Sequence, residues 1–186
     1  MKGKVARGIG VLKKAKPYFT QETLKTLYNS FVYPYFTYCI EVWGNVYSSH
    51  LEPLYKLQKW AIRIITCTKK RDHTSPLFHK LQLLKLNEIY VYFTTLLMYK
   101  YHHNFIPQVM QNLFIRNNAV HDYSTRQHNV LHVPISRSNL SSRNIRVTGV
   151  TLYNHFYRIL NWDVFYVTFK YNLKRYLLEN DITSLL

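Results

Sequence analysis

The side chains that could carry out catalysis are few in this sequence, and they are scattered. Nine Asp and Glu residues occur among 186. Two-metal phosphoryl transfer needs clustered carboxylates that hold ions about 3.5–4 Å apart, and the only neighbouring acids, Glu179 and Asp181, lie at the C-terminal end. The five glycines do not match a phosphate-binding loop, and no serine lies in a nucleophile elbow. The sequence therefore predicts no catalytic residue and no enzyme activity of its own.

Histidines are the remaining candidates for metal chemistry. His121, His128 and His132 occur in one segment, and His102 and His103 precede it. Zinc sites use three or four ligands, usually with Cys pairs or a His–Glu motif on a helix, and neither pattern is present. We interpret these residues as polar loop histidines, and we expect no metal and no cofactor.

Basic residues provide the stronger signal. Lys56, Lys59, Trp60 and Arg63 recur at the i, i+3, i+4, i+7 spacing of one helix face. Lysine and arginine bind a phosphate backbone by releasing its counterions, and Trp60 could stack on a base or pack in the core. The alternative is a solvated helix face with no partner.

Further basic residues lie at the N-terminus and in the segment 111–148. The N-terminal group is Lys2, Lys4, Arg7, Lys13, Lys14 and Lys16, and the later group is Arg116, Arg126, Arg137, Arg143 and Arg146. Because arginine binds phosphate in a bidentate manner, the later group is the better candidate for nucleic-acid contact. The N-terminal group is also what a frayed chain end would contain.

Apolar periodicity predicts the helices that would position these residues. We expect helices over 20–33, 51–66, 73–84 and 86–103, with Thr20 as the first N-cap. Pro34 should kink or restart the first helix. Its apolar stripe is expected to continue in phase through five later residues, before a stop at Gly44-Asn45: Tyr35, Tyr38, Cys39, Val42 and Trp43.

The second half of the chain differs in character. Residues 111–148 have little helical rhythm and predict an extended segment with one short strand at 130–135. Residues 149–186 recover a helical pattern, for which Asp163 is the expected N-cap.

Composition restricts the partner and the compartment. Twenty-five Lys and Arg residues give a net charge of +16, and 47% of residues are hydrophobic. A folded domain with this excess charge usually binds a polyanion, with nucleic acid as the first candidate and an anionic membrane surface or an acidic protein as alternatives.

No apolar run reaches the roughly 18 residues of a membrane helix. We interpret Cys39 and Cys67 as reduced core residues of an intracellular protein, nuclear or cytoplasmic, and a mitochondrial presequence stays open because no acid precedes Glu22.

The order of several motifs resembles a known family. LYNSFVYPYFTYCIEVWGN, LEPLYKLQKWAIRII and HTSPLFHKLQLLKLNEIY look like the region after the catalytic palm in reverse transcriptases of LINE-type, non-LTR retrotransposons, including jockey-like elements. KVARGIGVLKKAKPYF resembles the helix that precedes this region in those proteins. TRQHNVLHVPISRSNLSSRNIRVTGVTLYNHF and FKYNLKRYLL resemble their C-terminal tail. The chain departs from the family at Tyr153–Phe156, where a Trp-Asn pair and a Leu-Pro step are common.

The resemblance implies an all-α fold with three parts: a helical thumb-like domain over 1–108, an extended Arg-rich segment over 109–148 and a C-terminal helical segment over 149–186. It implies contacts to a template–primer duplex through Lys56, Lys59, Trp60, Arg63, Arg126, Arg137 and Arg143. The metal-binding Tyr-Ala-Asp-Asp motif of the palm is absent from the sequence. We therefore expect RNA, DNA or RNA–DNA duplex as partner, without polymerisation, and a palm and fingers domain supplied from outside this chain.

Three alternatives remain at this point. The chain could be a protein-interaction module whose basic charge docks on an acidic partner. It could be the relic of a decayed element, or an enzyme in its own right, such as a nuclease.

Overall fold

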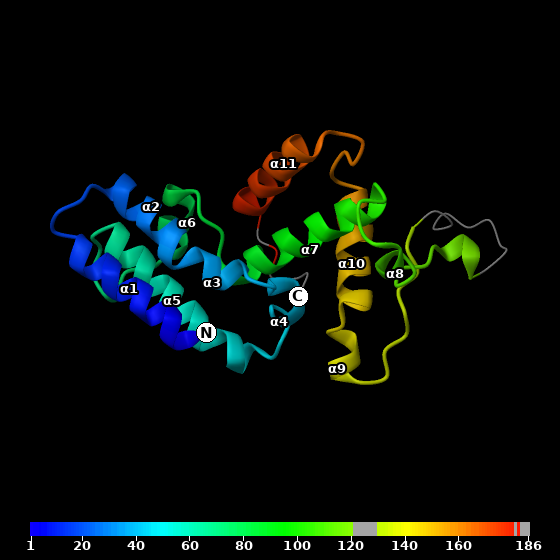
Figure 1. Ribbon diagram of the computed structural model, residues 1–186, viewed down its shortest axis with the longest axis horizontal. Coiled ribbons are helices and arrows are strands. Elements are labelled where there is room, and N and C mark those ends of the chain that lie inside the picture. Colours follow the sequence, from blue (N-terminus) through cyan, green and yellow to red (C-terminus); the bar gives the residue numbers. More distant parts are fainter. Residues whose placement is uncertain (121–129, 181, 183–186) are drawn as a thin grey trace. The chain divides into compact units, whose positions relative to one another are not determined.

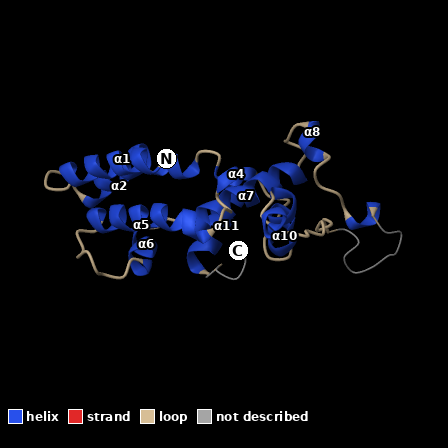
Figure 2. Ribbon diagram, turned by 90° about the horizontal axis from the view of Figure 1, so that it is seen from below, coloured by secondary structure: helices blue, strands red, loops and turns tan. Residues whose placement is uncertain are grey.

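The computed structural model describes residues 1–120, 130–180 and 182. Their regular structure is helical, and one isolated bridge between Arg116 and Leu131 is the only β-type pairing within this part of the chain (Figure 1, Figure 2). The predicted all-α fold is therefore confirmed. The chain divides into two compact units, Met1–Tyr90 and Val91–Leu186. The boundaries expected after residues 108 and 148 both fall inside the second unit.

Helices α1, α2 and α5 form the body of the first unit, with α1 packed against both others. Gly8 allows α1 to approach α2 closely, because a Cβ at this position would lie 2.4 Å from the carbonyl oxygen of Phe31. Shorter helices and the start of α7 complete the unit. The bounds are α1 (Lys2–Ala15), α2 (Gln21–Phe31), α3 (Tyr33–Thr37), α4 (Ile40–Trp43), α5 (Ser48–Ile65), α6 (Ser75–Leu81) and α7 (Leu86–His102).

The core of the first unit contains one buried polar side chain that connects three segments. Gln58 of α5 donates through Nε2 to the hydroxyl of Tyr28 at 3.2 Å and to the carbonyl of Leu84 at 3.0 Å. Burial raises the pKa of the Tyr28 phenol above its usual range. The buried apolar side chains of the same unit come in part from α1, α2, α3 and α5, and include Val5, Ile9, Leu12, Leu24, Phe36, Ala61 and Ile62.

Most local signals in the first unit were predicted correctly. The helices expected over 20–33, 51–66, 73–84 and 86–103 correspond to α2, α5, α6 and α7. Thr20 caps α2 by accepting a hydrogen bond from the N–H of Thr23. Pro34 lies in the first turn of α3, where the chain restarts, and α4 ends at Trp43, before the predicted stop.

The apolar stripe predicted beyond Pro34 is wrong. Phe36 and Ile40 are buried there, whereas none of the five predicted residues is: Tyr35, Tyr38, Cys39, Val42 and Trp43. The reason is that the helix breaks twice. Val32 has φ −121° and ψ −52°, and Cys39 adopts a left-handed conformation with φ 50°. Each break rotates the following turn, so α3 and α4 bury different positions from those of a continuous helix.

The interpretation of the cysteines as core residues is also wrong. Cys39 and Cys67 are both exposed, with free thiols. Both have positive φ, 50° and 54°, because each lies at a helix end where the chain turns back. Ile40 follows Cys39 and Ile65 lies two residues before Cys67; both isoleucines are buried, whereas the two cysteines are exposed.

Within its described residues, the second unit combines most of α7 with four further helices and a 3₁₀ turn. Its centre is aromatic: the rings of Tyr99 and Phe169 lie 4.4 Å apart, and those of Tyr153 and Trp162 lie 4.7 Å apart, centroid to centroid. The elements are α8 (Gln108–Gln111), η1 (Asn117–Ala119), α9 (Asn139–Ser142), α10 (Ile145–Tyr157) and α11 (Tyr166–Glu179).

The strand predicted at 130–135 is absent. Leu131 instead pairs with Arg116 in the single bridge, and its main chain exchanges two hydrogen bonds with the side chain of Asn154 on α10, at 3.0 and 2.8 Å. Of the alternating apolar residues, only Leu131 is buried, whereas Val133 and Ile135 are exposed. The predicted extended segment also contains α9 and the start of α10. Asp163 is not the N-cap of α11, since that position is taken by Phe165.

Candidate nucleic-acid interface

Helix α5 places Lys56, Lys59, Trp60 and Arg63 outside the core of the first unit. Lys56 and Trp60 are exposed, and Lys59 and Arg63 are half-exposed. The helix buries the opposite set of positions, including Leu54, Gln58, Ala61 and Ile62. A helix repeat of about 3.6 residues brings the four predicted residues to one side. The structure thus brings them together, as the spacing predicted.

Lys56 is the most exposed cation of this face and already has an acidic partner. Its Nζ lies 2.8 Å from Oε1 of Glu52, one turn earlier, and the two side chains are 69% and 60% exposed. The hydrogen bond and the charge of Lys56 lower the pKa of Glu52. Because so exposed an ion pair is weak, a phosphate can replace Glu52 as the partner of Lys56.

Lys59 and Trp60 combine charge with an aromatic surface. The Nζ of Lys59 lies 4.0 Å from the ring centroid of Tyr55, a cation–π contact that orients the ammonium group. Trp60 is 43% exposed, so its indole is a surface group and not a core anchor. This pair could hold a phosphate and pack an adjacent sugar or base.

Arg63 has a structural role that the sequence did not indicate. Its Nε and Nη2 donate to the carbonyl oxygen of Asp72 at 3.2 and 2.9 Å. The carboxylate of Asp72 in turn accepts a hydrogen bond from the N–H of Lys69 at 2.8 Å. Arg63 therefore positions the loop after α5, which carries the exposed cations Lys69, Lys70 and Arg71.

The arginines predicted in the tail belong to elements other than α5. Arg137 is exposed in the irregular segment before α9. Arg143 is half-exposed at the C-terminal end of α9. Arg126, like His121 and His128, lies outside the described residues. Both described arginines belong to the second unit, so they are not part of the α5 face.

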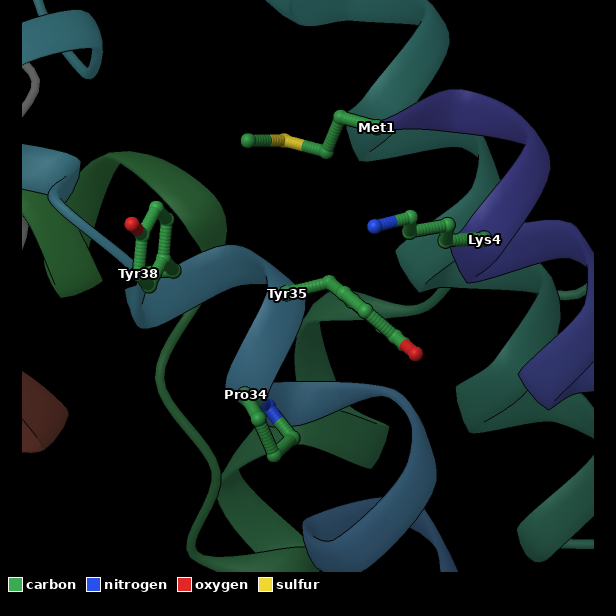
Figure 3. Close-up of a pocket in the computed structure, with 5 residues that line it drawn as sticks. All are labelled: Met1, Lys4, Pro34, Tyr35 and Tyr38. Atoms are coloured by element: carbon green, nitrogen blue, oxygen red, sulfur yellow. The ribbon is translucent and has the colours of Figure 1, made fainter.

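The structure contains a further basic and aromatic site that the sequence analysis missed. Two adjoining hollows of ≈ 410 Å³ and ≈ 240 Å³ share Lys4 and Tyr35 and lie between α1, the end of α2 and α3. We call them together the α1–α3 groove. Figure 3 shows the larger hollow, with the amine of Lys4 directed into the space that Tyr35 and Tyr38 border. The full lining is Met1, Lys4, Arg7, Gly8, Val11, Phe31, Pro34, Tyr35 and Tyr38.

The α1–α3 groove is cationic on one side and aromatic on the other. Lys4 and Arg7 come from successive turns of α1, and their side chains have no ion-pair partner among the described residues. Phe31, Tyr35 and Tyr38 are all exposed, Tyr38 to 74%. No acidic residue lines the groove. Such a site suits a ligand that combines a flat ring with a negative charge.

Five of the six N-terminal cations lie within α1, and Lys16 follows as its C-cap, so they belong to a folded helix and not to a frayed end. The signal that could have shown this is the spacing of Val5, Ile9 and Leu12, which are all buried. That spacing predicts an amphipathic helix over the first fifteen residues. Its partner across the groove could not be predicted, because it depends on how α1 packs on α2.

Over residues 1–120, 130–180 and 182, no cluster of three His, Cys, Asp or Glu side chains could hold a metal ion. In the same residues, no helix combines the length and the apolar character needed to cross a membrane. Comparisons with known protein families, with curated proteins and with solved structures found no match to this chain.

Proposed function

We propose that this chain binds nucleic acid as the thumb and C-terminal region of a non-LTR retrotransposon reverse transcriptase. The observation that carries the proposal is the charge of the first unit. It contains fifteen Lys and Arg residues against five Asp and Glu, a net charge of +10. Within it, Lys56 and Lys85 form ion pairs with Glu52 and Glu88. Most of its cations are thus available to phosphate groups.

The position of these cations supports a duplex as the partner of the α5 face. Lys56 and Lys59 lie one turn apart, and the loop with Lys69, Lys70 and Arg71 follows at the end of the same helix. A row of cations along a rigid helix can follow a phosphate backbone without reading its sequence. This is the binding expected of a thumb that holds a template–primer duplex.

The proposed role is binding and not catalysis. The sequence lacks the aspartates that hold metal ions in the palm of the family it resembles. A palm and fingers domain would supply the polymerase chemistry. The proposed partners are therefore RNA, DNA or their duplex, together with a catalytic domain.

A second candidate function is protein docking, and one observation favours it. Helix α11 exposes Val167 and Tyr171 one turn apart, next to the exposed Phe165. Exposed apolar groups that gather on one helix face often mark a protein contact. In this alternative, the basic charge would serve an acidic protein partner.

The α5 face can be tested by comparing lysine variants of the first unit. Fluorescence anisotropy with a labelled RNA–DNA duplex should show that Lys56→Gln with Lys59→Gln weakens binding about tenfold or more. Lys13→Gln with Lys80→Gln also removes two charges, from exposed lysines of α1 and α6, so it is the matched control and should have a small effect. Arg63 is left intact because it holds the loop after α5.

Two results would argue against the proposal. Equal losses of affinity in the α5 variant and in the control variant would show that net charge alone determines binding. Competition by polyglutamate at the same concentration of charges as nucleic acid would favour the docking function.

A further inference from the structure

We propose that the α1–α3 groove binds single-stranded nucleic acid, with a base against Tyr35 and Tyr38 and a neighbouring phosphate held by Lys4 and Arg7. The inference deepens the proposed function and rests on it, because it gives the chain a second site with a different preference. The α5 face has a row of cations suited to a duplex backbone, whereas the groove adds a hollow lined by exposed rings.

The aromatic side of the groove is held in place by the chain around it. The indole Nε1 of Trp43 donates to the carbonyl oxygen of Tyr38 at 2.7 Å. The hydroxyl of Thr37 donates to the carbonyl of Pro34 at 3.3 Å, within α3. These contacts fix the turn that carries Tyr35 and Tyr38. Exposed rings on a fixed backbone can stack on a base without first being ordered.

The cationic side selects the charge of the ligand. Lys4 and Arg7 are three residues apart on α1, so their side chains lie on the same side of the helix. Their lack of an acidic partner among the described residues means that a ligand phosphate would replace water and not a carboxylate. Arginine can also bind phosphate oxygens in pairs. An uncharged apolar ligand would leave both cations unused.

The shape of the groove favours a single strand over a duplex. In a duplex the bases stack on one another, and extruding one costs free energy. A single strand offers base faces to aromatic side chains directly, and its phosphates follow at close spacing. The hollow of ≈ 410 Å³ lies within the size range of sites that enclose small ligands. It can therefore take one base while the strand continues past Arg7.

The test uses two labelled probes of equal length, a single-stranded DNA of about 12 nucleotides and the matching RNA–DNA duplex, a length within the usual range of single-strand sites. Tyr35→Leu with Tyr38→Leu removes the rings and keeps apolar volume. It should weaken single-strand binding about tenfold or more and leave duplex binding within about twofold. Tyr35→Phe with Tyr38→Phe keeps the rings and should bind the single strand as the wild type does.

Controls separate the groove from general effects. If the double variant fails to fold, Tyr38→Leu alone can replace it in the test. This single variant should fold because Tyr38 is largely exposed. Tyr171→Leu removes an exposed tyrosine from α11 in the second unit and should leave both affinities unchanged. Ultraviolet cross-linking of a thio-substituted strand should label the peptide that contains Tyr35 and Tyr38.

The outcomes distinguish this inference from the proposed function. Unchanged single-strand binding in the leucine variants, or equal weakening for both probes, would overturn the groove as a single-strand site. Salt-dependent duplex binding would persist in that case, and the proposed function would stand. A wild-type chain that binds neither probe would refute both.

Discussion

Gly8 is the position where the packing of the first unit can be tested most sharply. It lies in α1 where this helix meets the end of α2. A Cβ added at Gly8 would lie 2.4 Å from the carbonyl oxygen of Phe31 and 3.1 Å from Cγ2 of Val32. The first contact is with a backbone atom, which cannot rotate away. Gly8→Ala must therefore push α1 and α2 apart.

Two opposing effects determine the size of the change. Alanine stabilises a helix interior by about 1 kcal/mol relative to glycine. Overpacking a close contact typically costs about 1–3 kcal/mol, and a backbone oxygen at 2.4 Å favours the upper end. We expect Gly8→Ala to lower the free energy of unfolding by about 2 kcal/mol. Gly10→Ala is the matched control, because a Cβ there has no atom within 4 Å.

Urea unfolding followed by circular dichroism measures the difference. Gly8→Ala should lower the urea midpoint by about 1 M, whereas Gly10→Ala should raise it by about 0.5 M, for typical denaturant slopes. Phe31 also lines the α1–α3 groove, so Gly8→Ala should weaken single-strand binding as well. A Gly8→Ala variant as stable as the wild type would refute the close packing of α1 on α2.

Three further predictions concern the second unit. Asn144→Ala should destabilise the chain by about 1 kcal/mol, because Asn144 Oδ1 caps α10 by accepting from the N–H of Arg146 at 3.0 Å; a urea midpoint equal to that of the wild type would contradict this. Asn154→Ala should open the segment around Leu131 to proteases, because it removes both hydrogen bonds to that main chain; an unchanged cleavage pattern would count against it. Burial holds the pKa of His102 below its ordinary value of 6.5, so the unfolded chain takes up a proton first. The stability that neutral His102 contributes to the folded chain is therefore present above about pH 6.5 and is lost as the pH falls below it. An equal loss of stability at low pH in a His102→Gln variant would argue against this cause.

The first unit shows which features can be predicted from sequence. Thr20 and Pro34 act through their own backbone neighbours, so the cap and the restart of the helix followed from residue type alone. The spacing of Lys56, Lys59 and Trp60 also predicted a shared face correctly, since it depends on one helix only. Local chemistry was sufficient in each case.

Features that depend on chain breaks or on other elements were not predicted. The left-handed Cys39 carries no glycine or asparagine signal, so the apolar stripe was extended across it. The segment around Leu131 was predicted as a strand, but its main chain bonds to the side chain of Asn154 on α10, a contact that local sequence does not indicate. The α1–α3 groove requires Lys4 and Tyr35 to meet across thirty residues of sequence. The need for a residue without a side chain at Gly8 depends on the close approach of α2, which the local sequence does not indicate.

Phosphate binding by the first unit is the central claim, and the salt dependence of duplex binding tests it most directly. Each phosphate contact contributes a slope of about −0.9 when log affinity is plotted against log salt. The α5 face and its loop provide Lys56, Lys59, Lys69, Lys70 and Arg71. If each of these five cations contacts one phosphate, the slope for the RNA–DNA duplex is about −4.5 between about 50 and about 200 mM salt. A slope near zero, or no binding at the lower salt concentration, would contradict the proposed function.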